Sequence, residues 1–599
     1  SDEAALVDKS LLVHRARFVQ FDLSMVATSV GVMNESEVAV TDTPIIDLAL
    51  IACLRSDFDG AGWYVDALEQ VVSQRALSAL GREQRVPALV ELRAQSAPIS
   101  VLTRLFMLGD TVAGQQLDQA LPACGVAGAV SLGLVQPVAD LGSPSRYRAT
   151  VDLRPYSAVI PDVMVGGGSD ADSTRQLNWW IASDLSSMVT GRALRLDHVL
   201  GVGGASTSLL EMTIRKPFTS ALDMGCGCGI QAMHLATHCE RVVATDLSER
   251  ACQFTRFNAA LNDVQIDVRA GSLFEPVAGQ TFDLIVTNPP FVITPDILRG
   301  DGDDLLEYRD GGMSRDELVR TVIQTGPDHL VPGGYMQMIG NWEIPADVDP
   351  DSGWSDRLKP WFSDRPVDAW IVQRDVLDPA QYVEMWLQDA DPHDADPEAD
   401  GELEIGESGA LVGVEDPSGL VDSKREIAYA KWLADFDSAN VGAVGMGFVA
   451  MRRLDADEAG GARGIQHFDL ELTGRRPLGA DVERTLDALR LPDDLGALTL
   501  VRADDVTEER HYVPGIPDPN VMILHQGSGL GRSIMVGTAV SAIVGACDGE
   551  LEVGQISAAV AMLTDREISD VRAEVDAPLR ALIRAGMLEV ATCSKQSTV

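Results

Sequence analysis

Two acids and one amide near the middle of the chain have the types and the spacing to bind a cofactor that carries a ribose and, beside it, an amine. Asp223 opens a D-x-G-x-G-x-G pattern, Asp246 follows it by 23 residues, and Asn288 opens an N-P-P-F motif. Glycines let a backbone approach a ligand closely, and an acid about 20 residues further on can accept hydrogen bonds from both ribose hydroxyls. A glycine pattern alone also occurs in dinucleotide binders and in ordinary turns. Asp246 and Asn288 are therefore needed to distinguish a ligand site from a turn.

Each of these residues stands at or just after the end of an apolar run that reads as a buried strand. Because proline cannot continue a central strand, the run before Asn288 must stop there and leave the Asn288 amide and the Pro289 carbonyl facing a pocket. Strand and helix patterns alternate through this region, which predicts a mostly parallel sheet covered on both faces. The predicted strands lie near 220–224, 241–246, 265–270, 282–287, 333–340, 367–373 and 443–452, with helices that include 231–237 and 249–261.

This combination resembles the class I S-adenosylmethionine (SAM)-dependent methyltransferases of the "small" amino-methylating branch, which join a D-x-G-x-G-x-G loop to an N-P-P-[FY] motif. The resemblance covers roughly 206–453. The R-D-G-G run from Arg309, the segment 316–320 and the L-V-P-G-G-Y run from Leu330 are similar to release-factor glutamine methyltransferases. Phe291 is more similar to the ribosomal RNA guanine and adenine enzymes.

The resemblance implies a Rossmann-like α/β domain with a seven-stranded sheet and SAM as cofactor. The amino-acid end of SAM would lie against Asp223 and the glycine turn, its ribose against Asp246, and its adenine against Leu273 or Phe274. Ser272 stands where the family's G-D-L-F motif has an acid. The predicted cofactor-binding residues are Thr207, Asp223, Gly225, Cys226, Gly227, Gly229, Asp246, Leu247, Ser272, Leu273, Phe274 and Asn288.

The predicted catalytic residues are the four of the second motif: Asn288, Pro289, Pro290 and Phe291. The lone pair of an amide or an aromatic amine is delocalised, and hydrogen bonds to the Asn288 side-chain oxygen and the Pro289 carbonyl would localise and aim it. Phe291 would stack on the planar group. We therefore expect methyl transfer to a planar nitrogen, either a glutamine side chain in a protein or an exocyclic base amine in rRNA or tRNA. A small-molecule methyltransferase and a non-catalytic scaffold are the alternatives.

The amino-acid composition limits the kinds of partner that the chain can bind. A net charge of −43 over 599 residues argues against a broadly basic nucleic-acid surface and against an anionic-membrane binder. Acidic charge favours a protein substrate, whereas Phe291 and the flanking domains favour nucleic acid. The eight cysteines form no C-x-x-C pair, which indicates reduced intracellular thiols and no metal site. No apolar run approaches ~20 residues and the N-terminus lacks a signal pattern, so we predict a cytoplasmic protein.

The chain divides into five predicted parts. Residues 1–40 are a flexible leader, 41–145 a helical, winged-helix-like domain, 146–215 a linking α+β segment, 216–455 the methyltransferase domain, and 456–599 a second winged-helix-like domain. Within the methyltransferase domain, 390–422 is predicted to be a disordered insertion, because eleven acids and no Lys or Arg occur between Asp389 and Asp416.

For three features outside the central motifs, we favour a structural role over a binding role. The helical stretch 115–127 offers glutamines but no Lys or Arg, which argues against DNA reading by the first winged-helix unit. Adjacent Trp179 and Trp180 are expected to be packing anchors rather than a stacking platform. The glycine cluster 527–533 is expected to be a turn rather than a phosphate cradle, because no acid follows it at the ribose-binding distance.

Overall fold

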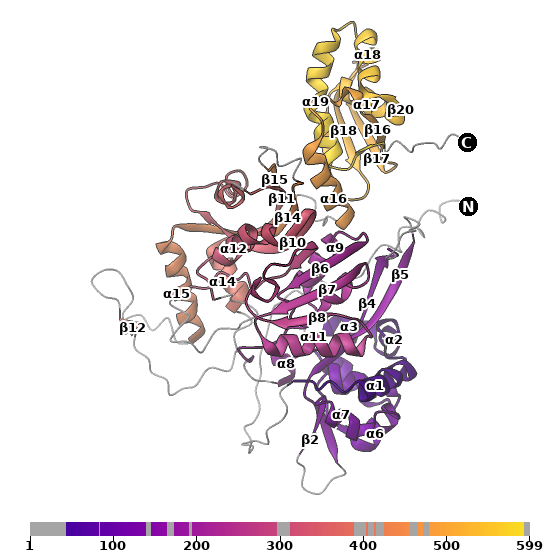
Figure 1. Ribbon diagram of the computed structural model, residues 1–599, viewed down its shortest axis with the longest axis vertical. Coiled ribbons are helices and arrows are strands. Elements are labelled where there is room, and N and C mark those ends of the chain that lie inside the picture. The colour runs from indigo at the N-terminus through magenta and orange to yellow at the C-terminus, as the bar shows by residue number, and fades with distance from the viewer. Residues whose placement is uncertain are drawn as a thin grey trace.

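An eight-stranded mixed sheet, in the order β15-β11-β14-β10-β9-β6-β7-β8, forms the centre of the computed structural model (Figure 1). The structure describes residues 43–82, 84–138, 145–163, 173–190, 194–295, 312–363, 365–387, 403–404, 413–414, 424–455, 464–470 and 478–591. The predicted leader 1–40 lies outside these residues, and so does most of the acidic stretch 390–422. Inside that stretch only β12 (Leu403–Glu404) and its antiparallel partner β13 (Gly413–Val414) are described.

The seven predicted strands occupy seven consecutive positions of this sheet. The strands β10, β9, β6, β7 and β8 run parallel, and β14 is antiparallel to both of its neighbours. The predicted count of seven is exceeded by one, because β15 adds a parallel strand beside β11. The bounds are β6 (Phe218–Met224), β7 (Cys239–Asp246), β8 (Asp267–Ala270), β9 (Phe282–Thr287), β10 (Leu330–Pro345), β11 (Val367–Leu377), β14 (Val441–Arg453) and β15 (Gln466–Leu470).

Helices cover both faces, as near-continuous burial of the central strands requires. Ser248 caps α11 by accepting a hydrogen bond from the Ala251 N–H, which is the usual way for serine to begin a helix. The predicted helices 231–237 and 249–261 are present as α10 and α11. The helices of this domain are α9 (Gly204–Met212), α10 (Ile230–Leu235), α11 (Glu249–Leu261), α12 (Glu317–Thr325), α13 (Ser355–Leu358), α14 (Pro379–Leu387) and α15 (Lys424–Ser438).

The N-terminal domain is mainly helical and ends in a small antiparallel sheet of order β1-β3-β2. From α5 onward its elements follow the order helix, strand, helix, helix, strand, strand, and the winged-helix assignment stays a prediction. The bounds are α1 (Leu48–Ala61), α2 (Val65–Val71), α3 (Gln74–Leu80), α4 (Val86–Arg93), α5 (Pro98–Leu102), the π-helix η1 (Thr103–Met107), β1 (Val112–Ala113), α6 (Gly114–Ala120), α7 (Gly125–Ser131), β2 (Val135–Val138) and β3 (Arg146–Ala149).

A long hairpin of β4 (Asp152–Pro161) and β5 (Thr174–Ser183) fixes this domain to the methyltransferase domain. Trp180 donates its indole N–H to the Trp63 carbonyl at 2.7 Å, and the Trp179 ring lies edge-on to His234 of α10 at 5.1 Å. Both tryptophans are buried, which confirms that they act as packing anchors. One hydrophobic core runs through the N-terminal helices, the hairpin and α11. The short α8 (Ser187–Thr190) follows the hairpin.

The C-terminal region has its own hydrophobic core and lies at one end of the molecule (Figure 1). It is joined to the large sheet by Arg490, whose guanidinium donates to both oxygens of the fully buried Asp368 carboxylate. The glycine cluster 527–533 forms the turn between β18 and β19. The elements are α16 (Gly479–Asp487), β16 (Thr499–Arg502), β17 (Val506–Tyr512), β18 (Pro519–Gln526), β19 (Ser533–Val536), α17 (Thr538–Ala546), β20 (Asp548–Glu552), α18 (Val553–Leu563), α19 (Ile568–Arg584) and β21 (Leu588–Val590).

Within the described residues, no helix is both long enough and apolar enough to cross a bilayer.

Candidate functional site

The glycine pattern forms a tight turn between β6 and α10. Gly225, Gly227 and Gly229 all have positive φ, at 77°, 53° and 83°, a conformation that glycine adopts without strain. A Cβ at Gly229 would lie 2.8 Å from the Thr255 side chain, so this position also needs glycine for packing. The D-x-G-x-G-x-G pattern is therefore explained by backbone geometry, and its N–H groups lie at the start of a helix.

Asp223, the next-to-last residue of β6, lies fully buried beneath this turn. Its Oδ2 accepts a hydrogen bond from the Ala232 N–H at 2.9 Å, whereas Oδ1 is buried and has no hydrogen-bond partner in the described part of the chain. Burial raises the pKa of this carboxyl to about 7. A buried acceptor without a partner is costly, and a cationic group of a ligand would satisfy it.

Asp246 ends β7 on the next strand and holds the glycine turn from the side. Its Oδ2 accepts from the Gly227 N–H and its Oδ1 from the Ser248 N–H, each at 2.9 Å. Each carboxylate oxygen keeps lone pairs for a further donor. Burial raises the pKa of Asp246 as well. The neighbouring Leu247 is 67% exposed, which leaves its side chain available to a ligand.

Side chains of α11 support the turn from behind. The Thr255 hydroxyl donates to the Gly227 carbonyl at 2.9 Å, and the Asn258 amide donates to the Cys228 carbonyl at 2.8 Å. Cys226 is buried with its thiol against Thr255, at 3.3 Å from that hydroxyl. The two cysteines of the turn, Cys226 and Cys228, are thus both packed inward.

The predicted adenine-binding turn follows β8. The Gly271 N–H donates to the Asp246 carbonyl at 2.8 Å, which places the turn beside the predicted ribose-binding residue. Ser272 and Leu273 are half-buried there, and Leu273 has a φ of 46°. Phe274 lies deeper, buried and stacked on His329 with ring centroids 4.5 Å apart. Of the three residues, Ser272 and Leu273 are the more accessible to a ligand.

The N-P-P-F motif leaves the sheet directly beside the glycine turn. Met224 pairs with Thr287 across β6 and β9, and the Thr287 hydroxyl donates to the Met224 carbonyl at 2.7 Å. A Cβ built on Gly225 would lie 3.8 Å from the Asn288 carbonyl oxygen. Pro289 is buried, whereas Asn288, Pro290 and Phe291 are half-buried. The two motifs therefore meet at the carboxyl edge of the sheet, where open α/β sheets bind ligands.

Thr207 belongs to α9, which packs against the start of α10. Its hydroxyl donates to the Gly203 carbonyl at 3.1 Å inside its own helix. The Gln231 side chain donates to the Ser206 carbonyl at 2.8 Å and joins the two helices. This arrangement brings α9 to the glycine turn, and a direct contact of Thr207 with a ligand stays a prediction.

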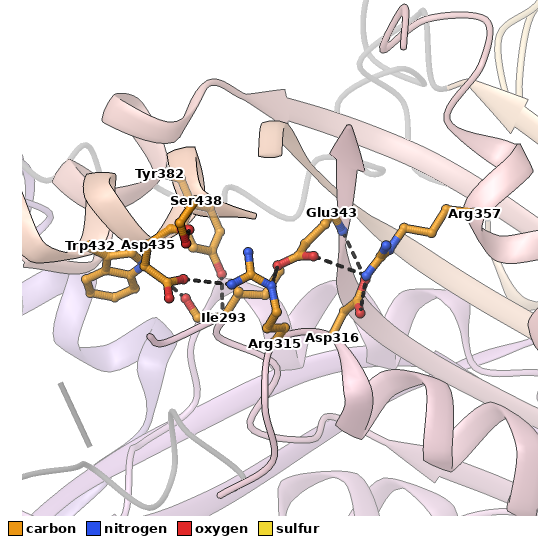
Figure 2. Close-up of polar contacts among 9 residues, drawn as sticks. All are labelled: Ile293, Arg315, Asp316, Glu343, Arg357, Tyr382, Trp432, Asp435 and Ser438. Carbon is orange, nitrogen blue, oxygen red and sulfur yellow. Dashed lines mark hydrogen bonds and ion pairs between the residues drawn. The ribbon is translucent and has the colours of Figure 1, made fainter. Parts of the chain in front are cut away.

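Sequence reasoning missed a set of polar residues around the chain that follows Phe291. Figure 2 shows them: Tyr382 and Trp432 flank Ile293, and Arg315 lies between Asp435 and Glu343. Only Asp316, which Arg357 holds in a bidentate ion pair, belonged to a segment singled out from the sequence. Arg315 directly precedes that segment, and the others come from elements that the chain reaches later, with no local pattern to mark them.

A cavity of about 440 Å³ borders this polar set rather than the glycine turn. None of its lining residues is a predicted site residue, and Arg315 and Arg357, which line it, are both ion-paired. The strand-edge geometry is a better guide to the site than this cavity, because the predicted residues converge at that edge. The lining residues are Ser314, Arg315, Asp316, Glu317, Arg320, Gln324, Arg357, Pro360 and Trp361.

Sequence comparison relates two parts of the chain to known families. Residues 60–149 match a domain of unknown function (DUF7059), and residues 201–299 match the methyltransferase small domain. The first match coincides with most of the N-terminal domain. The second contains the glycine turn, Asp246 and the N-P-P-F motif, so the site described above lies within it.

Two curated relatives match part of the chain. A release factor glutamine methyltransferase of Geobacter sulfurreducens is 33% identical over 157 residues, 24% of this chain and 55% of the relative. A ribosomal RNA small subunit methyltransferase C of Alcanivorax borkumensis is 32% identical over 124 residues, 21% of this chain and 33% of the relative. The chain thus spans about half the length of the first relative and a third of the second.

Among solved structures, a 16S rRNA N2 G1207 methyltransferase of T. thermophilus in complex with AdoMet and guanosine is 17% identical. That match covers 46% of this chain and 66% of the other, with a TM-score of 0.22, which is too low to support a conclusion. The assignment rests instead on the sequence matches and on the ordered motifs that the structure brings together. Residues 201–299 accordingly belong to the methyltransferase small-domain family.

Proposed function

We propose that this chain is a cytoplasmic SAM-dependent N-methyltransferase that methylates a planar nitrogen, either a protein glutamine amide or an exocyclic amine of an RNA base. One observation carries the proposal: the N-P-P-F motif leaves β9 beside the glycine turn, with the Asn288 carbonyl oxygen 3.8 Å from a Cβ built on Gly225. A ligand on the turn and an acceptor at the motif would therefore be neighbours.

The residues around the turn fit SAM. The unpartnered Oδ1 of Asp223 would accept from the ammonium of the amino-acid end, and the free lone pairs of Asp246 would accept from the ribose hydroxyls. Leu247, Leu273 and Ser272 would lie along the nucleoside. Bound SAM supplies an activated methyl group on a sulfonium, so the protein needs to add orientation rather than covalent chemistry.

The acceptor half supplies that orientation. Two N–H groups of a planar amine would donate to the Asn288 side-chain oxygen and the Pro289 carbonyl, which directs the nitrogen lone pair toward the methyl carbon. These residues would hold the nitrogen in line with the methyl group that bound SAM would supply, and the methylated nitrogen would lose one proton to solvent. Phe291 is half-buried beside these groups and would stack on the planar acceptor. The name of the first curated relative gives glutamine as the methylated residue, which supports a planar nitrogen, and the name of the second gives ribosomal RNA.

The flanking domains are proposed to present the substrate. We infer winged-helix-like folds for both, with nucleic-acid binding as one use and protein docking as the other. The net charge of −43 favours a protein surface, and the stacking residue Phe291 favours a base. The domain limits 41–145, 146–215, 216–455 and 456–599 are part of the same proposal.

The test is transfer of tritium from methyl-labelled SAM to purified ribosomes, release factors and tRNA, with Asp246→Ala as the negative control. Label in one fraction, absent with the control, would support the proposal and name the acceptor. Cofactor binding without transfer to any of the three would replace it with small-molecule methylation. Failure to bind SAM at micromolar concentration in calorimetry would indicate a scaffold.

A further inference from the structure

We propose that α14 and α15 position the acceptor motif: Tyr382 and Trp432 hold both backbone polar groups of Ile293 and so fix the chain that carries Asn288 to Phe291. This inference rests on the proposed function of the motif. It assigns a role in the reaction to residues 89 and 139 positions further along the chain.

The motif is fixed first at the end where it leaves the sheet. Thr287 is the last residue of β9, paired with Met224 and bonded to the Met224 carbonyl through its hydroxyl. Beyond it two prolines remove the backbone N–H groups that a strand partner would need. The sheet therefore holds the motif at one end only.

The other end is held by side chains. The Ile293 N–H donates to the Tyr382 hydroxyl at 2.9 Å, and the Ile293 carbonyl accepts from the Trp432 indole N–H at 3.1 Å (Figure 2). Ile293 is 1% exposed, so water is a poor substitute for either partner. The five residues 288–292 thus lie between two fixed points, Thr287 and Ile293, and include the motif.

The two holding side chains are themselves immobilised. Tyr382 is completely buried, and its hydroxyl also accepts from the Asn341 amide of β10 at 2.9 Å. Trp432 is buried too, with its ring 6.4 Å from that of Tyr382. Because Asn341 belongs to the central sheet, the position of the Tyr382 hydroxyl is set by the sheet rather than by α14 alone.

Arg315 ties α15 to the same sheet. Its Nη1 pairs with Asp435 of α15 at 2.7 Å, and its Nε pairs with Glu343 of β10 at 2.7 Å. Asp435 lies three residues after Trp432, so both point from one face of the helix. Arg357 completes the set by pairing with Glu343 at 3.1 Å and with Asp316.

Apolar packing alone would leave the peptide planes free to rotate. Val292 and Ile293 share a hydrophobic cluster with α14 and α15, which fixes where the segment lies. The two hydrogen bonds fix which way its N–H and C=O groups point, and therefore the direction of the Pro289 carbonyl a few residues earlier. An error of about 1 Å in such a group can cost about 100-fold in rate.

The test uses Tyr382→Phe and Trp432→Phe in the full chain, which keep a ring and remove one hydrogen bond each. Tyr429→Phe is the matched control, because its hydroxyl lies on α15 and bonds only the exposed Glu384, at 3.3 Å, among the contacts described. We expect kcat to fall about 10- to 100-fold in both variants, with SAM affinity within twofold of the starting protein and the control unchanged.

Hydrogen exchange measured by mass spectrometry separates this inference from the proposed function. Peptides covering 288–295 should exchange faster in both variants and at the original rate in the control. Unchanged exchange in these peptides would overturn the inference even if no methyl acceptor is found. Faster exchange with an unaltered kcat would also overturn it, because the hydrogen bonds would then hold the chain without positioning the acceptor. Loss of SAM binding in parallel with kcat would indicate general unfolding and contradict a positioning role.

Discussion

The cofactor half and the acceptor half of the site are held together by contacts of very different sequence range. Around the glycine turn, hydrogen bonds join residues 2, 9 and 19 positions apart: Ser248 to Asp246, Ala232 to Asp223, and Gly227 to Asp246. Around Ile293 the partners are 89 and 139 positions away. The cofactor half is held by contacts within its own motif region. The acceptor half depends on helices that are distant in the sequence and contact it only in the folded protein.

Because of this difference, SAM binding and methyl transfer should depend on different parts of the chain. The proposed cofactor site depends mainly on β6, β7 and the helices that follow them, α10 and α11. The acceptor site also needs β10, α14 and α15 in place, since Asn341, Tyr382 and Trp432 come from those elements. Substitutions in the first half should therefore change SAM affinity, and those in the second should change the rate of transfer at nearly constant affinity.

Asn288→Ala should have the largest effect and defines the acceptor half. Removing the side-chain acceptor that aims the amine should lower kcat about 100- to 1000-fold, the range seen when one preorganised hydrogen-bonding group is lost from a reacting centre. SAM affinity, measured by calorimetry, should fall less than tenfold. An equal loss of kcat and of SAM affinity would show that Asn288 is chiefly a cofactor ligand. It would then not belong to a separate acceptor half.

Asp246→Ala tests the cofactor half, where SAM affinity rather than kcat should change most. It would remove the two charge-assisted hydrogen bonds proposed for the ribose hydroxyls, and it leaves the Gly227 and Ser248 N–H groups without their acceptor. We expect SAM to bind about 100-fold more weakly, equivalent to about 3 kcal/mol. Glu249→Ala, an exposed acid on the next helix, is the control and should bind normally. Normal binding by Asp246→Ala would remove the ribose assignment.

The same contrast explains what could be predicted from the sequence. Asp223, Gly225, Gly227, Gly229 and Asp246 were predictable because backbone conformation and strand ends dictate residue types at fixed spacing. The seven strands were predictable because buried parallel strands are continuous apolar runs. The eighth, β15, was missed, since its five residues are only half-buried and show no such run.

The anchors of the acceptor half could not be predicted. Nothing in the residues around Tyr382 or Trp432 indicates that their polar atoms meet Ile293, because that contact depends on how α14 and α15 pack on β10 and β14. Likewise Glu343 reads as one acid in an apolar strand, and only the fold supplies Arg315 and Arg357 beside it. Long-range pairs of this kind carry no spacing that a single sequence can show.

The pH dependence of SAM affinity should sharpen the assignment of Asp223. Its pKa is raised to about 7 in the unliganded protein, and only the ionised form offers the ammonium a charged acceptor at the unpartnered Oδ1. From the ionised fractions at pH 6 and pH 8, SAM should bind about tenfold more tightly at pH 8. Calorimetry of Asp223→Asn should show no such pH dependence; a dependence that persists would exclude Asp223 as its source.

The sign for stability is the reverse of the sign for affinity. Because burial raises the folded pKa of Asp223 above its unfolded value, the protonated form is the one that folding favours. Its contribution to the free energy of unfolding is full below about pH 4 and is lost as the pH rises through about 7. Thermal unfolding of the unliganded protein should therefore show a smaller loss of Tm between pH 5 and 7.5 in Asp223→Asn than in the starting protein. An equal loss would contradict the burial argument.

The smallest expected effect lies at the far end of the cofactor half, where Ser272 replaces the acid of related enzymes. The turn is held beside Asp246 by the Gly271 N–H, and Ser272 is half-buried. Ser272→Asp would add a carboxylate that can accept from the adenine amine, a hydrogen bond with a net value of about 1 kcal/mol, so SAM should bind about fivefold more tightly. Ser272→Asn is the control for side-chain size. A cofactor analogue without the 6-amino group should show no gain with Ser272→Asp. A gain of the same size with that analogue would mean that the adenine amine lies elsewhere. The motifs of the cofactor half would then determine its contacts with the ligand less completely than its short-range hydrogen bonds indicate.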